Sequence, residues 1–134
     1  MDSVILPKVV PKLRVTASEG RGASIMPGHI SAKLMSYGSM EVRWYAPDGV
    51  DLQVPHDRDE LYVIVQGMAV FIRAEDTVSF GDDLALNLRG EERVAVTPGD
   101  ALFVPAGTEH RFEAMSADFG AWMIFYGPEG GEQR

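Results

Sequence analysis

Two histidines and one glutamate stand at positions in this 134-residue chain from which they could hold a metal ion together. His56 precedes Glu60 by four residues, just before a β-prone run, and His110 follows a Pro-x-Gly turn much later in the chain. Two imidazoles and one carboxylate form the ligand set of an open mononuclear site, as in non-haem iron enzymes. The chain has only three histidines, so we expect His56, Glu60 and His110 to bind a divalent metal ion.

The residues around His56 and Glu60 favour a corner between strands over a helix. Pro55 disfavours a helical conformation for the residue before it. The residues between the histidine and the glutamate, 57–59, form a polar Asp-Arg-Asp corner whose charges are expected to be solvated. The run Leu61–Val65 after Glu60 is strongly β-prone. A side-chain period of two then places Tyr62 on the same face as Glu60, within reach of the site.

Short apolar runs separated by Gly, Pro and Asp predict an all-β domain. The expected strands are Met40–Tyr45, Leu61–Val65, Ala69–Ile72, Leu84–Leu88, Arg93–Val96, Ala101–Val104, Arg111–Ala114 and Ala121–Tyr126. Turn residues lie between them, such as Pro98-Gly99, where proline presets one φ and glycine accepts a positive one. Short strands at this spacing are typical of a sandwich or barrel.

The two ends of the chain and the segment before the first of these strands are less regular. Residues 28–36 are loosely amphipathic, and a helix, an irregular segment or another strand would fit them. We interpret residues 1–23 as an N-terminal arm and residues 127–134 as a flexible tail. The chain length then allows one domain over residues 1–134.

Composition excludes several classes of protein. The absence of cysteine excludes disulfides, thiolate metal sites and cysteine nucleophiles. A formal net charge of -8 argues against binding to nucleic acid. No apolar run is long enough for a membrane span, and prolines and lysines interrupt the apolar N-terminus, which argues against a signal peptide. We therefore expect a cytoplasmic protein without a nucleic-acid or membrane partner.

Both histidine-bearing segments resemble the two motifs of the cupin superfamily. The first motif, G-x5-H-x-H-x3,4-E-x6-G, is matched in spacing by His56, Glu60 and Gly67. The second motif, G-x5-P-x-G-x2-H-x3-N, is matched by Gly99, Pro105, Gly107 and His110. The resemblance extends over residues 49–114, about half of the chain. It implies a double-stranded β-helix, or jelly-roll barrel, that commonly forms a homodimer and holds a small molecule in its mouth.

Two positions depart from the motifs. Val54 stands where the first motif has its leading histidine, and Ala114 stands where the second motif ends in asparagine. The resemblance implies a metal set of three histidines and one glutamate, of which this chain keeps His56, Glu60 and His110. That remaining set suffices for a divalent ion such as Fe, Mn, Ni or Zn.

Three further residues bear on the missing ligand and on the substrate. Gln53, next to Val54, has an amide oxygen, but a regular strand would turn it to the opposite face. His29 could replace the lost imidazole from another strand, although the simpler interpretation is a surface histidine. Arg43 would approach the site and could bind an anionic substrate if its face of the strand points inward.

The simplest assignment points the opposite, apolar face of that strand inward. The residues then expected to face the interior are Met40, Val42 and Trp44. Phe112 and both tryptophans are assigned to the core, because aromatic side chains more often fill a barrel than line a site.

The function we expect is that of a metal-dependent enzyme acting on a small molecule, with Tyr62 as a hydrogen-bond donor or acid. The superfamily includes dioxygenases, isomerases and decarboxylases. A dioxygenase is favoured, because three protein ligands leave positions for both oxygen and substrate. Two alternatives remain open because of Val54. One is a non-catalytic binding or sensor domain, and the other is a metal-free isomerase that uses histidine and tyrosine as acid and base.

Overall fold

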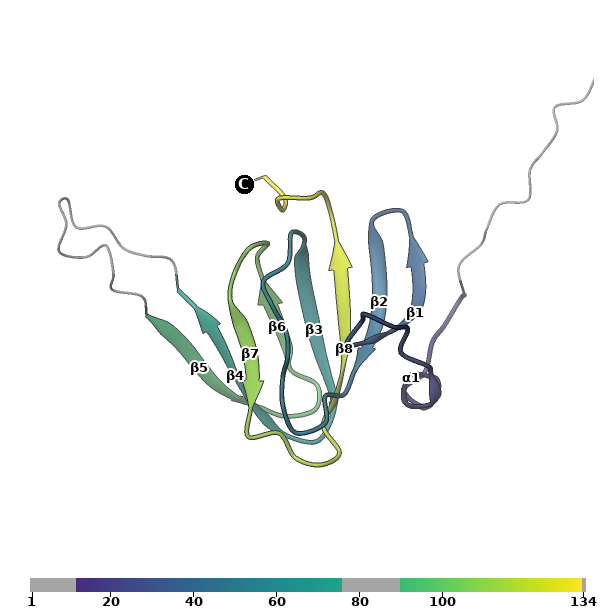
Figure 1. Ribbon diagram of the computed structural model, residues 1–134, viewed down its shortest axis with the longest axis horizontal. Helices are drawn as coiled ribbons and strands as arrows, with labels where there is room; N and C mark the ends of the chain where they lie inside the picture. The colour runs from purple at the N-terminus through teal and green to yellow at the C-terminus, as the bar shows by residue number, and fades with distance from the viewer. Residues whose placement is uncertain (1–11, 76–89, 134) are drawn as a thin grey trace, which may run out of the picture.

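A computed structural model describes residues 12–75 and 90–133. They form two antiparallel sheets (Figure 1). One hydrophobic core links the two sheets. The larger sheet has the strand order β1-β2-β8-β3-β6. Its strands are β1 (Ala32–Tyr37), β2 (Met40–Tyr45), β8 (Gly120–Tyr126), β3 (Asp59–Gln66) and β6 (Ala101–Val104). The smaller sheet has the order β5-β4-β7. Its strands are β5 (Glu91–Val96), β4 (Ala69–Ala74) and β7 (His110–Glu113).

The strands predicted from the sequence agree with this arrangement. β2 and β6 have the expected bounds, and the other expected strands within the described residues differ by one or two residues at their ends. The expected strand Leu84–Leu88 lies outside the described residues. In the loosely amphipathic segment 28–36, the strand alternative holds in part, since β1 covers its second half.

A short helix, α1 (Ala17–Gly22), lies in the segment that we interpreted only as an arm. Thr16 caps it by accepting from the backbone of Glu19, whose side chain accepts in return from the Thr16 backbone. This reciprocal capping box is a known signal for the start of a helix, but no helix was predicted here. No helix within the described ranges is both long and apolar enough to cross a membrane.

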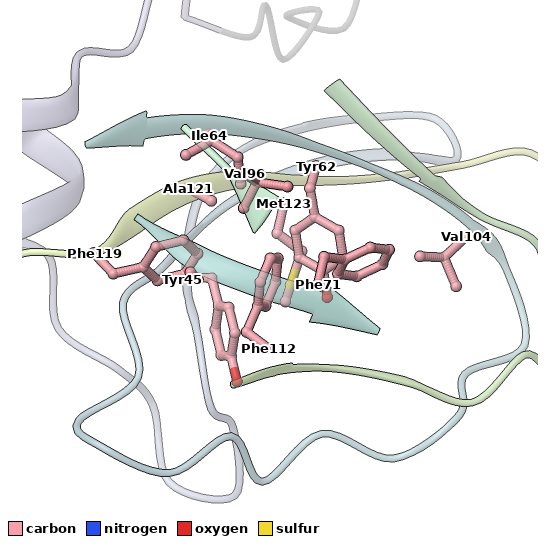
Figure 2. Packing of buried hydrophobic residues seen from close by; sticks show 11 residues of the cluster. Tyr45, Tyr62, Ile64, Phe71, Val96, Val104, Phe112, Phe119, Ala121 and Met123 are labelled. Carbon is pink, nitrogen blue, oxygen red and sulfur yellow. The ribbon is translucent and has the colours of Figure 1, made fainter. Parts of the chain in front are cut away.

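Inward-facing side chains of both sheets form one hydrophobic core (Figure 2). Tyr62 and Ile64 come from β3, Phe71 from β4 and Phe112 from β7, so the core links the larger sheet to the smaller one. The aromatic rings of Tyr62 and Phe112 meet edge to face, with their centroids 5.0 Å apart. The assignment of Phe112 to the core is therefore confirmed.

The face of β2 that points inward is the opposite of the one expected. Arg43 lies directly across from Met123, and Tyr45 across from Ala121; Met123, Tyr45 and Ala121 all belong to the core. Trp44 is also buried, but on the outer face, where a Cβ added to Gly20 of α1 would lie 2.8 Å from its ring. The prediction that Met40, Val42 and Trp44 face the interior is wrong, because α1 covers the outer face.

The outer position of Trp44 also decides the place of the second tryptophan. Trp122 is the direct cross-strand partner of Trp44, and their ring centroids are 5.1 Å apart. Side chains opposite each other on neighbouring strands lie on the same face of a sheet. Trp44 is therefore buried as expected but packs outside the barrel interior, and Trp122 is only partly buried on that outer face. The barrel interior is more polar along β2 than expected.

Candidate metal centre

The structure brings His56, Glu60 and His110 together at one end of the core. Glu60 is the second residue of β3 and is completely buried, and His110 is the first residue of β7. His56 lies in the irregular segment before β3. The Glu60 Oε1 atom is 2.7 Å from His56 Nε2 and 3.3 Å from His110 Nε2. One ligand atom from each residue lies within 4.8 Å of the others, so the cluster could hold a metal ion.

Backbone carbonyls fix the orientation of both imidazole rings. His56 Nδ1 lies 2.7 Å from the carbonyl oxygen of Arg58, and His110 Nδ1 lies 2.9 Å from that of Thr108. A carbonyl oxygen can only accept, so each Nδ1 carries the proton. Each Nε2 then turns its lone pair toward Glu60. Metal-binding histidines are typically held in this way by a hydrogen bond on the nitrogen that faces away from the metal.

The atoms that converge at the centre are acceptors. With both Nδ1 atoms protonated, the two neutral imidazoles offer only lone pairs to the Glu60 carboxylate. The other carboxylate oxygen, Glu60 Oε2, is buried and has no hydrogen-bond partner among the described residues. A buried charged group without a partner is costly, so the cluster needs a cation or an extra proton. A divalent ion fits this set of donor atoms.

His56 is the residue that can take up this proton when no ion is bound. Burial opposes a charge on its ring, but the hydrogen bond that the charged ring donates to Glu60 and the negative charge of Glu60 outweigh that effect and raise the pKa of His56. The imidazolium would donate to Glu60 Oε1, where a metal ion would otherwise sit. Protons and metal ions therefore compete for the same atoms.

Gln53 also points into the centre, whereas a regular strand was expected to place it on the opposite face. Its Oε1 atom lies 3.2 Å from His110 Nε2 and accepts a hydrogen bond from the Tyr62 hydroxyl. Val54, at the position of the missing motif histidine, has 73% of its surface exposed. The expectation for Gln53 assumed a regular strand, whereas residues 51–56 adopt no regular secondary structure. Side-chain parity therefore does not apply to this segment.

The Tyr62 hydroxyl reaches the centre from the core side. It lies 3.2 Å from His110 Nε2. Burial, followed by the negative charges of Glu60 and Asp51, raises the pKa of Tyr62 well above its ordinary value. Tyr62 is therefore a neutral phenol that can donate a hydrogen bond. Its assignment as a catalytic residue stays a prediction.

Asp51 accepts hydrogen bonds from several groups at this end of the barrel, a role that was not predicted from the sequence. Its carboxylate accepts from the Tyr45 hydroxyl, from the backbone N–H of Gln53 at 3.0 Å and from the backbone N–H of Phe112 at 2.7 Å. These bonds attach the irregular segment to β7. A single aspartate in a turn-rich stretch carries no sequence signal for this role.

Asp59 has a related role at the polar corner, where we expected solvated charges. It is buried and accepts from the backbone N–H groups of Ala106 at 2.9 Å and Glu132 at 2.9 Å. The backbone N–H of Gly130 also donates to the carbonyl of Asp57 at 2.6 Å. For Asp59 the expectation was wrong, because backbone donors from two distant segments converge on it. The corner that carries His56 is thereby fixed.

A cavity of about 410 Å³ adjoins the cluster and includes His56 in its wall. Arg43 lines it and is buried, with only 7% of the residue exposed. Arg43 Nε donates to Ser31 Oγ at 2.6 Å, and Nη2 lies 3.2 Å from His29 Nδ1. His29 thus lies beside Arg43 in the cavity wall and is not part of the three-residue cluster. It does not replace the lost imidazole.

Comparison with known proteins agrees with the fold and leaves the activity open. No family model matches the chain. The chain is 36% identical over 93 residues to the uncharacterized protein SCO3923 of Streptomyces coelicolor, an alignment that covers 68% of this chain and 73% of that protein. This relative has no described activity that could be compared.

Solved structures share the fold over most of the chain. A conserved protein of unknown function from Streptococcus pyogenes has a TM-score of 0.56 at 18% identity, covering 90% of this chain and 92% of its own. KdgF from a Halomonas species has a TM-score of 0.53 at 21% identity, with coverages of 79% and 86%. A cupin superfamily protein from Desulfitobacterium hafniense has a TM-score of 0.50 at 21% identity, with coverages of 87% and 94%. The chain therefore has the double-stranded β-helix fold, as the cupin superfamily protein from Desulfitobacterium hafniense does.

Proposed function

We propose that this protein is a cupin that binds a divalent metal ion through His56, Glu60 and His110 and acts on a small molecule in the adjoining cavity. The observation that carries the proposal is the convergence of lone pairs. Two imidazole Nε2 atoms and one buried carboxylate face one another, while backbone carbonyls hold both Nδ1 protons away from the centre. A bound divalent ion would supply Lewis-acid or oxygen-activating chemistry at this point.

The protein residues around the centre support a catalytic use of the ion. Tyr62 is a neutral phenol next to His110 Nε2, so by turning its O–H away from Gln53 it can donate a hydrogen bond or a proton to a substrate atom held at the centre. Its side chain is fully buried beneath the cluster, which excludes bulk water from this position. Among the reactions of the superfamily we favour an oxygen-dependent one, because a 2-His-1-carboxylate set leaves open positions for oxygen and substrate.

The experiment that tests this function is metal analysis followed by an activity screen. Purified protein reconstituted separately with Fe, Mn, Ni and Zn is expected to retain one ion per chain in at least one case. The variant His29→Ala should retain the same ion, since His29 lies outside the cluster. Protein that stays metal-free after every reconstitution would overturn the proposal. Oxygen uptake with catechols, thiols and keto acids then separates an enzyme from a metal-binding sensor.

The cavity wall favours a substrate with an anionic group. Arg43 and Arg58 both pair with the same carboxylate, Glu41, so the wall has one excess positive charge in a chain of net charge -8. Within the described residues, Arg43 Nε and Nη2 make hydrogen bonds to residues 29–31. Arg43 Nη1 lies 3.7 Å from the Glu41 carboxylate, which is beyond hydrogen-bond distance. A ligand carboxylate could take this position. Phe125 and Met123 give the rest of the wall an apolar character.

Removal of the Arg43 charge should therefore weaken binding of carboxylates but not of neutral analogues. Phenylacetate and phenylacetamide have nearly the same shape and differ in charge. In metal-loaded protein, Arg43→Met should reduce phenylacetate affinity by about 10-fold, the loss of one charge-assisted hydrogen bond. Phenylacetamide affinity should change much less. Isothermal titration checks both ligands, with Arg111→Met on the exposed surface of β7 as a control. Equal losses for both ligands in Arg43→Met would contradict the assignment.

A further inference from the structure

We propose that Gln53 supplies a fourth metal ligand through its amide oxygen and so replaces the imidazole that this chain lacks at Val54. The inference rests on the metal site proposed above and concerns how this chain completes it. Gln53 Oε1 lies 3.2 Å from His110 Nε2, the ligand atom of the cluster that also lies 3.3 Å from Glu60 Oε1. Val54 is largely exposed, so the residue at the expected position does not face the centre.

The hydrogen bonds of Gln53 determine which end of its amide faces the centre. Its Nε2 group donates to Asp51 Oδ2 at 2.9 Å, and its Oε1 accepts from the Tyr62 hydroxyl. The reversed amide would place its oxygen against the Asp51 carboxylate, where two acceptors would repel each other. Asp51 therefore presents the oxygen of Gln53 to the centre. One lone pair of that oxygen remains available beside the bond from Tyr62.

The backbone of residues 51–56 explains why position 53, and not position 54, faces inward. At one end of the segment, Asp51 accepts from the backbone N–H of Phe112 at 2.7 Å. At the other end, the carbonyl of His56 accepts from the backbone N–H of Gly107 at 2.6 Å. These two contacts hold the segment against residues 107–112, which include His110. Gln53 lies between the two fixed points and thus opposite His110.

A glutamine oxygen in place of an imidazole changes the preference of the site. The set of donor atoms becomes two imidazole nitrogens and two oxygens, from Glu60 and Gln53. Oxygen ligands suit harder ions such as Mn²⁺, whereas imidazole suits Zn²⁺ and other later ions of the series. We therefore expect Gln53→His to raise the affinity for Zn²⁺ relative to that for Mn²⁺.

Metal titration of substitutions at the two neighbouring positions tests the inference. Gln53→Met has a similar volume without an oxygen donor. It should weaken Mn²⁺ binding by about 10-fold or more, because the loss of a residue that only orients a metal ligand already costs that much. Val54→Ala and Val54→His should both bind Mn²⁺ as the wild type does. Isothermal titration gives the affinities. The visible spectrum of bound Co²⁺ should change in Gln53→Met and Gln53→His but not in the Val54 variants, and circular dichroism verifies that each variant folds.

The outcomes separate this inference from the proposed function. If the wild type binds no metal ion, the proposed function fails and the inference fails with it. If the wild type binds an ion but Gln53→Met keeps both the affinity and the Co²⁺ spectrum, only the inference fails. Tighter binding by Val54→His would also overturn it, because position 54 would then face the centre. Should Gln53→Met not fold, the Co²⁺ spectrum of Gln53→His decides, and an unchanged spectrum counts against the inference.

Discussion

Glu60→Gln is expected to abolish tight metal binding and to leave the metal-free protein at least as stable as the wild type. Glutamine removes the only negative charge in the cluster. The affinity for a divalent ion should therefore fall by more than roughly 100-fold, the largest loss typical for a residue that only orients a metal ligand. In the metal-free state, at a pH above the raised pKa of His56 where its imidazole is neutral, the same change should relieve a cost. The amide N–H₂ can donate to the Nε2 lone pair of His56 or His110, which face this position at 2.7 Å and 3.3 Å.

Thermal unfolding with and without metal measures both effects. A ligand present at 100 times its dissociation constant stabilises the native state by about 2.7 kcal/mol. For a domain of this size that free energy raises the Tm by on the order of 10 °C. The wild type should show this rise and Glu60→Gln should not, while its Tm without metal stays level or increases. Glu41→Gln, in the cavity wall but outside the cluster, is the matched control and should keep the rise.

Two results would contradict this interpretation of the cluster. A full metal-induced rise of the Tm in Glu60→Gln would place the ion elsewhere. A large loss of stability without metal would mean that the carboxylate already has a strong partner, such as a permanently charged His56. In that case the cluster would be a structural ion pair. The protein would then fit one of the two alternatives, a binding or sensor domain or a metal-free isomerase.

The sequence predicted the three residues of the cluster because they lie in two segments whose residue types and spacings match known motifs. Glu60 begins β3 and His110 begins β7, and a strand that starts with a polar residue before apolar ones can be recognised without the structure. The turn glycines that flank the motifs set the strand ends. The strands were predicted from the short apolar runs between turn residues, and for β2 and β6 both ends were correct.

What could not be predicted lies where the backbone is irregular or where both faces of a strand are covered. The position of Gln53 depends on bonds between Asp51 and β7, and these residues are far apart in the sequence. The inward side of β2 was misjudged because α1 buries Trp44 on the outer face, so the apolar residues no longer mark the interior. Both errors concern the polar residues around the cluster and left the ligands themselves unaffected.

Gly67→Ala is expected to destabilise the fold by about 3 kcal/mol or more, because backbone strain and steric overlap add at this position. Gly67 follows β3 in the larger sheet and precedes β4 in the smaller one, so the chain changes sheets there. Its φ is +75°, a left-handed conformation that alanine adopts only with strain. An added Cβ would overlap Ser116 Oγ and lie 2.7 Å from Phe119 Cα and 2.8 Å from Phe119 N.

Gly99→Ala is the matched control, because Gly99 is also a motif glycine with positive φ, at +96°, but an added Cβ there meets no atom within 4 Å. It should cost only the backbone strain, about 1–2 kcal/mol. Urea unfolding with a constant m-value measures both losses. Equal losses would show that φ alone decides. A larger loss at Gly67 would show that the close approach of Ser116 and Phe119 adds to the backbone strain where the chain crosses from one sheet to the other.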